Sequence, residues 1–279
     1  MFPRWSILPA AIALVSGSLL AAAAGTASAA TTAAAVGAAN APRPAAVNPK
    51  GFNPGGKVKL RPGVQPSLHG KYYQDESTNW SGYAVTGGDG SFHSVSSSWT
   101  EPAATCDDNG DEYAAFWVGL DGFNSDSVEQ TGTDSDCDAG TPDYYGWYEM
   151  YPADPVYFSN PVQPGDSMSA SVAFTGTDTY TLTLTDNTQG WTQTETENES
   201  GLANSSAEII TEAPSSEFGP LPLADFGTVD YAASTVNGQS MASLSPTQII
   251  MVGQSGDQLD TTSSMDNSGD FSNTWEAES

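Results

Sequence analysis

Apolar and polar residues alternate along much of the chain with the two-residue period of β-strands. Residues 167–176 carry an apolar side chain at every second position, and residues 179–185 alternate Tyr and Leu with Thr. Residues 206–212 also alternate, and short apolar runs at 114–120 and 248–252 are typical of buried strands. Turn-forming residues recur between these segments, and no long helical stripe or internal repeat is found. The pattern therefore predicts an all-β fold, a two-sheet antiparallel β-sandwich of the jelly-roll or concanavalin-like type.

The N-terminus has the features of a secretory signal peptide, which we predict to be Met1–Ala29. Arg4 supplies the positive start, residues 7–20 are apolar, and Ala27-Ser28-Ala29 provides a small-residue cleavage site. A membrane anchor is the alternative, but the strongly apolar stretch is short for a span, and no later segment is long and apolar enough. We therefore expect a secreted, extracellular protein that has no membrane association after processing.

The residues that follow differ in composition from the rest of the chain. Residues 31–44 are rich in Ala, and residues 42–66 are rich in Pro, Gly and Asn, with few large apolar side chains. Such a segment cannot bury enough surface to form its own core, so we expect an unstructured propeptide. This predicts a signal peptide at 1–29, a basic propeptide at 30–76 and a β-sandwich domain at 77–279. We expect propeptide cleavage within Tyr72–Ser77.

The charges are separated along the chain. All 7 basic residues lie at or before Lys71 and all 34 acidic residues lie at or after Asp75, so a +7 leader precedes a −34 domain. The leader is either a flexible spacer or a segment that lies on the acidic domain and inhibits it. The charge separation favours the second interpretation, because opposite charges attract at short range. Since carboxylates become neutral below about pH 4, we hypothesise that acid releases this electrostatic latch.

The lack of basic residues after Lys71 excludes several kinds of chemistry. Nucleic-acid binding needs Lys or Arg to neutralise phosphates, so no nucleic-acid partner is expected. Without lysine the domain has no Schiff base, and its single histidine, His93, cannot form an HExxH or three-histidine zinc site. We predict no metal and no cofactor. Carboxylates, amides, hydroxyls and aromatic rings remain as functional groups.

Cys106 and Cys137 are the only cysteines in the chain. A disulfide is the default in an exported protein, and a metal site is disfavoured because no histidine lies between them. Closing a loop of this size stabilises a fold by roughly 3–4 kcal/mol in the chain-entropy model.

A carboxylate and an amide are sufficient for acid hydrolysis of a peptide bond. A carboxylate can take a proton from water and return it to a leaving group, and a neutral amide can donate to a developing oxyanion. Alternation over residues 206–212 places Glu208, Ile210 and Glu212 on one face. Glu208 is a candidate base, although a solvent-facing surface residue is the alternative.

Short motifs follow one another through the acidic part of the chain. In order they are TNWSGY from Thr78, VSSSWTEP from Val95, FWVGLDG from Phe116, EQTG from Glu129, WYEMYP from Trp147, NSSAEIITEAP from Asn204 and DFG from Asp225. Together they resemble the glutamic peptidases, the eqolisin family, from about Thr78 to near Gln254. The resemblance implies a secreted, pepstatin-insensitive acid endopeptidase with a β-sandwich fold and polypeptide substrates.

The resemblance also implies roles for individual residues. The family's catalytic pair corresponds to Gln130 and Glu208, with Glu208 as the general base and the Gln130 amide stabilising the oxyanion. Positions that shape or support the family's cleft correspond to Trp117, Asp121, Asp134, Trp147 and Glu149. A structural role is the alternative for each of these five. We further expect the mature enzyme to be a monomer.

Two other functions are compatible with parts of the sequence. Glu149 and Glu208 resemble the paired carboxylates of a glycoside hydrolase. Alternatively, Trp147, Tyr148 and Tyr151 form a stacking platform in a non-catalytic carbohydrate- or protein-binding module. An aspartic peptidase is disfavoured because the chain lacks a pair of Asp-Thr-Gly or Asp-Ser-Gly motifs.

Overall fold

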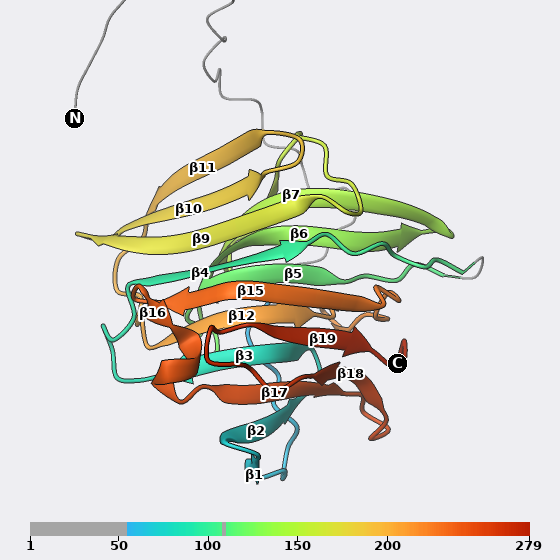
Figure 1. Ribbon diagram of the computed structural model, residues 1–279, viewed down its shortest axis with the longest axis horizontal. Coiled ribbons are helices and arrows are strands. Elements are labelled where there is room, and N and C mark those ends of the chain that lie inside the picture. The colour runs from blue at the N-terminus through green and yellow to red at the C-terminus, as the bar shows by residue number, and fades with distance from the viewer. Residues whose placement is uncertain (1–54, 108–109) are drawn as a thin grey trace, which may run out of the picture. The chain divides into compact units, whose positions relative to one another are not determined.

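The computed structural model describes residues 55–107 and 110–279, and these residues form two β-sheets packed face to face (Figure 1). The predicted signal peptide and the predicted propeptide up to residue 54 lie outside the described residues. Within the described part there is one short 3-10 turn, η1 (Met241–Leu244), and no α-helix. The all-β sandwich predicted from the alternating pattern is therefore confirmed.

The first sheet carries the candidate site. Its strands, in spatial order, are β1 (Ser67–His69), β2 (Tyr72–Ser77), β17 (Thr247–Val252), β3 (Trp80–Thr86), β12 (Ser206–Glu212), β5 (Ala115–Leu120), β6 (Val128–Asp138), β7 (Thr141–Tyr151) and β8 (Val156–Tyr157). All neighbours are antiparallel except β2 and β17. Strand β12 lies in the interior of this sheet, between β3 and β5, and every one of its residues is buried.

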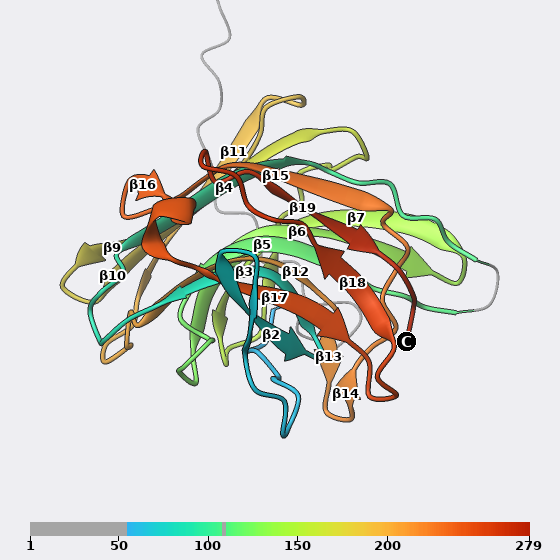
Figure 2. The same ribbon diagram turned by 60° about the horizontal axis from the view of Figure 1, so that its bottom comes forward.

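The second sheet covers one face of the first. Its strands, in spatial order, are β11 (Trp191–Asn198), β10 (Thr179–Asp186), β9 (Ser167–Gly176), β4 (Ser94–Thr100), β15 (Thr228–Val236), β19 (Phe271–Trp275) and β18 (Gln258–Thr262). The two sheets are connected where β18 pairs with β17, and β16 (Gln239–Ser240) extends the end of β15. A separate hairpin of β13 (Ser215–Ser216) and β14 (Gly219–Pro220) follows β12, near β18 in Figure 2.

The main hydrophobic core lies between the two sheets. From the second sheet, β9 and β10 contribute Met168, Val172 and Leu182, and from the first sheet β12 and β5 contribute Ile209 and Phe116. The polar residues that alternate with them on β9 and β10 are partly exposed. This burial confirms the strand faces predicted from the two-residue period.

A second apolar cluster lies on the opposite face of the first sheet. Trp80, Trp117, Trp147 and Ile210 belong to it and are fully buried. Along β12, Ala207 and Ile209 face the core between the sheets, whereas Ile210 faces this second cluster. Since side chains two apart share a face of a strand, Glu208 and Glu212 also belong to the face of Ile210. The candidate site is built on this face.

Part of the segment predicted to be an unstructured propeptide is folded. Residues 67–77, expected to belong mostly to an unstructured propeptide, form β1 and β2, and β2 is paired on both sides. The predicted domain boundary between residues 76 and 77 therefore falls inside a strand. The predicted disulfide is present, with a Cα–Cα distance of 5.5 Å between Cys106 and Cys137. In the residues that the structure describes, no helix has the length and apolar character needed to cross a membrane.

Candidate active site

Gln130 is fully buried on β6, next to Glu149 on the adjacent strand β7. Its side-chain amide donates a hydrogen bond to Glu149 Oε2 at 2.7 Å and a second one to the main-chain carbonyl of Gly55. Because the amide nitrogen has two protons, this arrangement uses both of them. Glu149 therefore fixes the orientation of the Gln130 amide, and the other N–H points at a carbonyl oxygen.

Glu212, at the end of β12, has a carboxylate surrounded by donors. Trp117 Nε1 donates to Oε2 at 3.1 Å, and Asn79 Nδ2 donates to Oε1 at 3.1 Å. The main-chain N–H of Gly56 also donates to Oε1, at 3.1 Å. These bonds hold the carboxylate in a fixed position although it is completely buried.

Gln130 and Glu212 meet at a single peptide bond. The carbonyl that Gln130 binds and the N–H that Glu212 binds are the two polar groups of the bond between Gly55 and Gly56. One side chain thus donates to the oxygen of this peptide and the other accepts from its nitrogen. A donor at the carbonyl and a proton-transfer group at the nitrogen are the two groups that hydrolysis requires.

Burial determines the protonation of the carboxyls in this site. Burial raises the pKa of Glu212 well above its usual value, and the donors Gly56, Asn79 and Trp117, together with the charge of Lys59, act in the opposite direction. Burial also raises the pKa of Glu149, and the negative charge of Glu212 raises it further. Glu149 and Glu212 are therefore suited to gain and lose protons, and the site does not favour both of them being permanently ionised.

The predicted supporting residues Trp117, Asp134 and Trp147 are all buried next to this site. The Trp117 ring packs edge-on against Trp80 with 4.9 Å between ring centroids, and its N–H holds Glu212. Trp147 Nε1 donates to Asp134 Oδ1 at 2.7 Å. These rings belong to the apolar cluster on this face of the sheet, and the Trp117 and Trp147 N–H groups bind the carboxyls of Glu212 and Asp134.

Asp121 has a different position from the other predicted residues. It follows β5 with a positive φ of 68°, and its carboxylate accepts from Asn204 N at 2.7 Å and from Ser205 N at 2.8 Å. Ser205 Oγ donates a further bond at 3.1 Å. Asp121 therefore anchors the chain just before β12 and positions the strand that carries Glu212.

Glu208 does not join Gln130 in the structure. It lies across Gly119 from Gln130 in the strand register, yet neither of its carboxyl oxygens makes a hydrogen bond of standard geometry within the described residues. Burial raises its pKa, and the charges that add to this effect are Asp121 and Glu129 rather than the groups around Gln130. Glu212, four residues further along the same face, is the carboxylate that meets Gln130 at one peptide bond.

The same geometry weighs against the two alternative functions. The Gln130 amide donates to Glu149, and Glu208, its proposed partner, makes no hydrogen bond of standard geometry to Gln130, Glu149 or Glu212 within the described residues. Trp147 is fully buried, so it cannot form an exposed stacking platform, and Tyr148 stacks on Phe158 and donates to Glu197. An exposed aromatic platform that includes Trp147 is therefore not found.

The sequence motifs did not indicate site roles for Glu212, Asn79 or the Gly55-Gly56 pair. The alternation could have indicated Glu212, since it shares a face of the strand with Glu208. Asn79 lies in the TNWSGY motif. The choice between the two glutamates depends on which one reaches Asn79 and Trp117, and that requires the register of β12 against its neighbours.

Comparison with known proteins gives a consistent result. The model of the peptidase A4 family matches residues 78–275. The chain is similar to a crystal structure of scytalido-glutamic peptidase with a transition state analog inhibitor, at 27% identity and a TM-score of 0.61, over 71% of this chain and 98% of that one. No curated protein sequence matches the chain.

Two further solved structures have the same fold. SCP-B, a member of the eqolisin family of peptidases in a complex with the tripeptide Ala-Ile-His, has 25% identity and a TM-score of 0.58, with 71% of this chain and 98% of that one covered. Aspergilloglutamic peptidase from Aspergillus niger has 28% identity and a TM-score of 0.52, with 59% and 99% covered. The aligned part is thus nearly the whole length of each of these proteins.

Proposed function

Because this chain belongs to the peptidase A4 family, the glutamic peptidases or eqolisins, we propose that it is a secreted acid endopeptidase with Gln130 and Glu212 as its catalytic pair. Family membership makes it a hydrolase of peptide bonds. The observation that supports the catalytic pair is the binding of one peptide bond by both side chains, Gln130 at its oxygen and Glu212 at its nitrogen. Glu212 replaces Glu208 in the role expected from the sequence.

The mechanism uses one water molecule and two side chains. Ionised Glu212 takes a proton from the water as the water oxygen attacks the carbonyl carbon of the substrate. The Gln130 amide donates to the oxygen, which becomes negative in the tetrahedral intermediate, and Glu149 keeps that amide in place. Protonated Glu212 then transfers its proton to the leaving nitrogen, and the C–N bond breaks. No metal or cofactor takes part.

Acid activity requires Glu212 to ionise at low pH in the open cleft. In the described structure Gly56 covers the carboxylate, and burial is the main cause of its raised pKa. When the leader leaves, water reaches Glu212, while the donors Asn79 and Trp117 remain. The departing segment takes away the Gly56 donor and the Lys59 charge, which both favour the ionised form. We expect hydration of the uncovered carboxylate to outweigh this loss and to lower its pKa in the open enzyme.

The leader is proposed to act as an intramolecular inhibitor that acid releases. Its backbone binds Gln130 and Glu212, and Lys57 forms an ion pair with Asp126 of the domain. Protonation of Asp126 removes this attraction, and because Lys57 lowers the pKa of that carboxyl, release needs a pH below the usual range of an aspartate. The signal peptide predicted at residues 1–29, secretion and a monomeric mature enzyme belong to the same proposal.

A proteolysis assay tests the function. The wild-type chain should digest denatured casein at about pH 3–4 in the presence of pepstatin. Gln130→Ala should lower kcat by ~10²–10³, because an oxyanion donor is removed. Full activity of Gln130→Ala on casein would rule out the proposed mechanism, and hydrolysis of a polysaccharide but not of casein would favour the glycosidase alternative.

A further inference from the structure

The leader segment from Gly55 to Lys59 is held in the site by its backbone. Trp80 Nε1 donates to the Gly56 carbonyl at 3.0 Å, and Asn79 Nδ2 donates to the Lys57 carbonyl at 3.1 Å. Asn79 Oδ1 also accepts from the Lys59 N–H at 2.8 Å. Backbone bonds of this kind recognise an extended peptide independently of its side chains. The segment that follows Gly55 is therefore bound as a peptide substrate would be.

The contacts of the bound segment continue past the catalytic pair on the C-terminal side of the bound bond. The Val58 N–H donates to the Gly122 carbonyl at 3.2 Å, and the Val58 side chain packs against the tryptophan cluster. The Thr78 N–H donates to the Lys59 carbonyl at 2.9 Å. Consecutive leader residues thus have defined positions, which fixes the peptide bond between Gly55 and Gly56 at Gln130 and Glu212.

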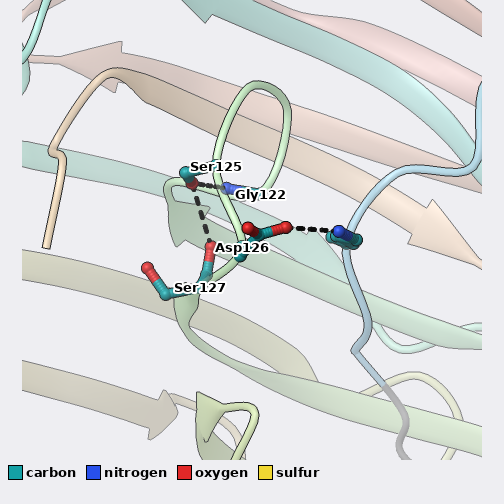
Figure 3. A network of polar contacts seen from close by, with 5 residues as sticks. Gly122, Ser125, Asp126 and Ser127 are labelled. Carbon is teal, nitrogen blue, oxygen red and sulfur yellow. Dashed lines mark hydrogen bonds and ion pairs between the residues drawn. The ribbon is translucent and has the colours of Figure 1, made fainter.

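Side chains add charge recognition to this register. Lys57 pairs with Asp126 in the loop between β5 and β6, and Figure 3 shows this carboxylate beside Ser125, which accepts from the Gly122 N–H and donates to the Ser127 carbonyl. Lys59 Nζ donates to Ser215 Oγ at 2.6 Å. The loop that holds Asp126 is therefore braced, and it places a negative charge opposite the second residue after the bound peptide bond.

Steric contact with Gln130 explains why position 55 is a glycine. A Cβ added to Gly55 would overlap the Gln130 amide, whereas a Cβ added to Gly56 would lie 3.9 Å from Glu212 Oε1, an ordinary contact. Only glycine at position 55 allows its carbonyl to approach the Gln130 amide in this register. The leader thus combines a required glycine before the bond with a tolerant position after it.

We propose that the peptide bond between Gly55 and Gly56 is a self-processing site, which the chain cuts in its own cleft. The proposal rests on the proposed peptidase function. The step requires Glu212 to be ionised while the segment is bound, a state that the donors Gly56, Asn79 and Trp117 and the charge of Lys59 favour. One water molecule then adds across the bond: its oxygen joins the Gly55 carbonyl carbon, the bond to the Gly56 nitrogen breaks, and the protons pass through Glu212 to the new amine. The products are a segment that ends in the Gly55 carboxylate and a domain that begins with Gly56 and keeps Lys57, Lys59 and Arg61.

This site differs from the cleavage region expected from the sequence. Tyr72–Ser77 forms β2, which pairs with β1 on one side and with β17 on the other. A peptidase cleft binds an unpaired, extended segment, so β2 would have to leave the sheet before it could be cut. Gly55 and Gly56 already lie at the catalytic pair, and no rearrangement of the sheet is needed.

The test is acidification of the full chain followed by intact mass measurement and N-terminal sequencing. Wild type should yield a domain that begins at Gly56, at a rate independent of protein concentration, because the reaction is intramolecular. Glu212→Gln should stay uncut. Gly55→Val should lose this cut, and Gly56→Ala, the matched control, should still be cut at the same bond and yield a domain with alanine as its first residue.

Assays on denatured casein distinguish failure of this inference from failure of the function. If casein is digested but the domain begins elsewhere, or if cutting depends on protein concentration, self-processing at this bond is wrong and the peptidase function stands. The same holds if wild type remains intact and inactive while Gly55→Val digests casein, since the leader would then be a stable inhibitor. If no variant digests casein, the proposed function fails, and this inference fails with it.

Discussion

At the residue scale, the site depends on which atoms face a bound peptide. Gln130 has a single amide nitrogen with two protons, and one of these protons is donated in the hydrogen bond to Glu149. The remaining proton is the one that can stabilise an oxyanion. Glu149 is thus a positioning residue, and its raised pKa fits a neutral carboxyl that accepts this bond through its carbonyl oxygen at acid pH.

Comparing two glutamine variants tests the choice of the catalytic carboxylate. Glu212→Gln should reduce kcat on casein to near background, because an amide cannot take a proton from water, while it keeps an oxygen acceptor for Trp117 or Asn79. Glu208→Gln, on the same face of β12, should keep most of the activity. Steady-state kinetics at about pH 4 measure both, with folding checked by circular dichroism. Loss of activity in Glu208→Gln alone would reverse the assignment.

Glu208 and Glu212 also show how much of the site can be predicted from the sequence. The motifs located Gln130 and the strand that carries the carboxylate, but alternation gives Glu208 and Glu212 the same face. Only the cross-strand register, which sets Glu212 opposite Trp80 and Ala115, distinguishes the two. Register depends on contacts between residues far apart in sequence, which local patterns do not encode.

At the element scale, β12 is the strand on which the site depends. It is buried along its whole length between β3 and β5. Gly82 on β3, with a φ of 126°, approaches the Ile209 carbonyl so closely that any side chain would overlap it. The glycine in the TNWSGY motif therefore has a steric reason that the sequence alone did not reveal.

Asp121 should stabilise the start of β12. Asp121→Ala leaves the N–H groups of Asn204 and Ser205 buried without their acceptor, so we expect a loss of about 2–3 kcal/mol, as is typical for hydrogen bonds to a charged group. Urea denaturation measures the loss. Asp121→Asn is the matched control and should be less destabilising because it keeps one oxygen. Equal stability of wild type and Asp121→Ala would mean that the anchor has no energetic role.

The disulfide connects the end of β6 to the loop that carries Cys106. Replacing both cysteines by alanine should lower the free energy of unfolding by about 3–4 kcal/mol in the chain-entropy model, because 31 residues separate them. Denaturation of the wild type with and without reductant provides an independent measure of the same loss. Unchanged stability in both experiments would show that the bridge does not restrain the unfolded chain.

Strands were predicted correctly where apolar and polar side chains alternate. They were missed where only pairing with a neighbouring strand makes the segment extended. Strands β9 and β10 were predicted within one residue because one face of each is buried. Strand β12 was predicted equally closely although both of its faces are buried. Strands β1 and β2 lie in a stretch with few large apolar residues, and pairing with β17 orders them. A polar segment that becomes a strand through its neighbour has no local signal.

At the scale of the whole molecule, negative charge and buried carboxyls favour acid conditions. Burial raises the pKa of Glu101 to about 8 and that of Glu129 to about 9. Burial also raises the pKa values of Glu208 and Asp260 well above their usual range. In the unfolded chain these groups titrate near pH ~4. All of the domain's formal charge after Lys71 is negative, so repulsion between ionised surface carboxylates acts in the same direction.

The sign of the pH dependence follows from these shifts. Between about pH 4 and pH 8 the folded state binds more protons than the unfolded state, so stability decreases as pH rises. We expect the melting temperature to be highest near pH 4 and to fall by at least ~5–10 °C by pH 8, since each kcal/mol corresponds to roughly 2–4 °C in a domain of this size. Glu101→Gln should flatten the curve, because the neutral amide keeps an oxygen for the donors Thr133 and Trp99 without a titrating proton. Scanning calorimetry of both proteins across this range measures the effect, and a higher melting temperature at pH 8 than at pH 4 would show that buried carboxyls do not control stability.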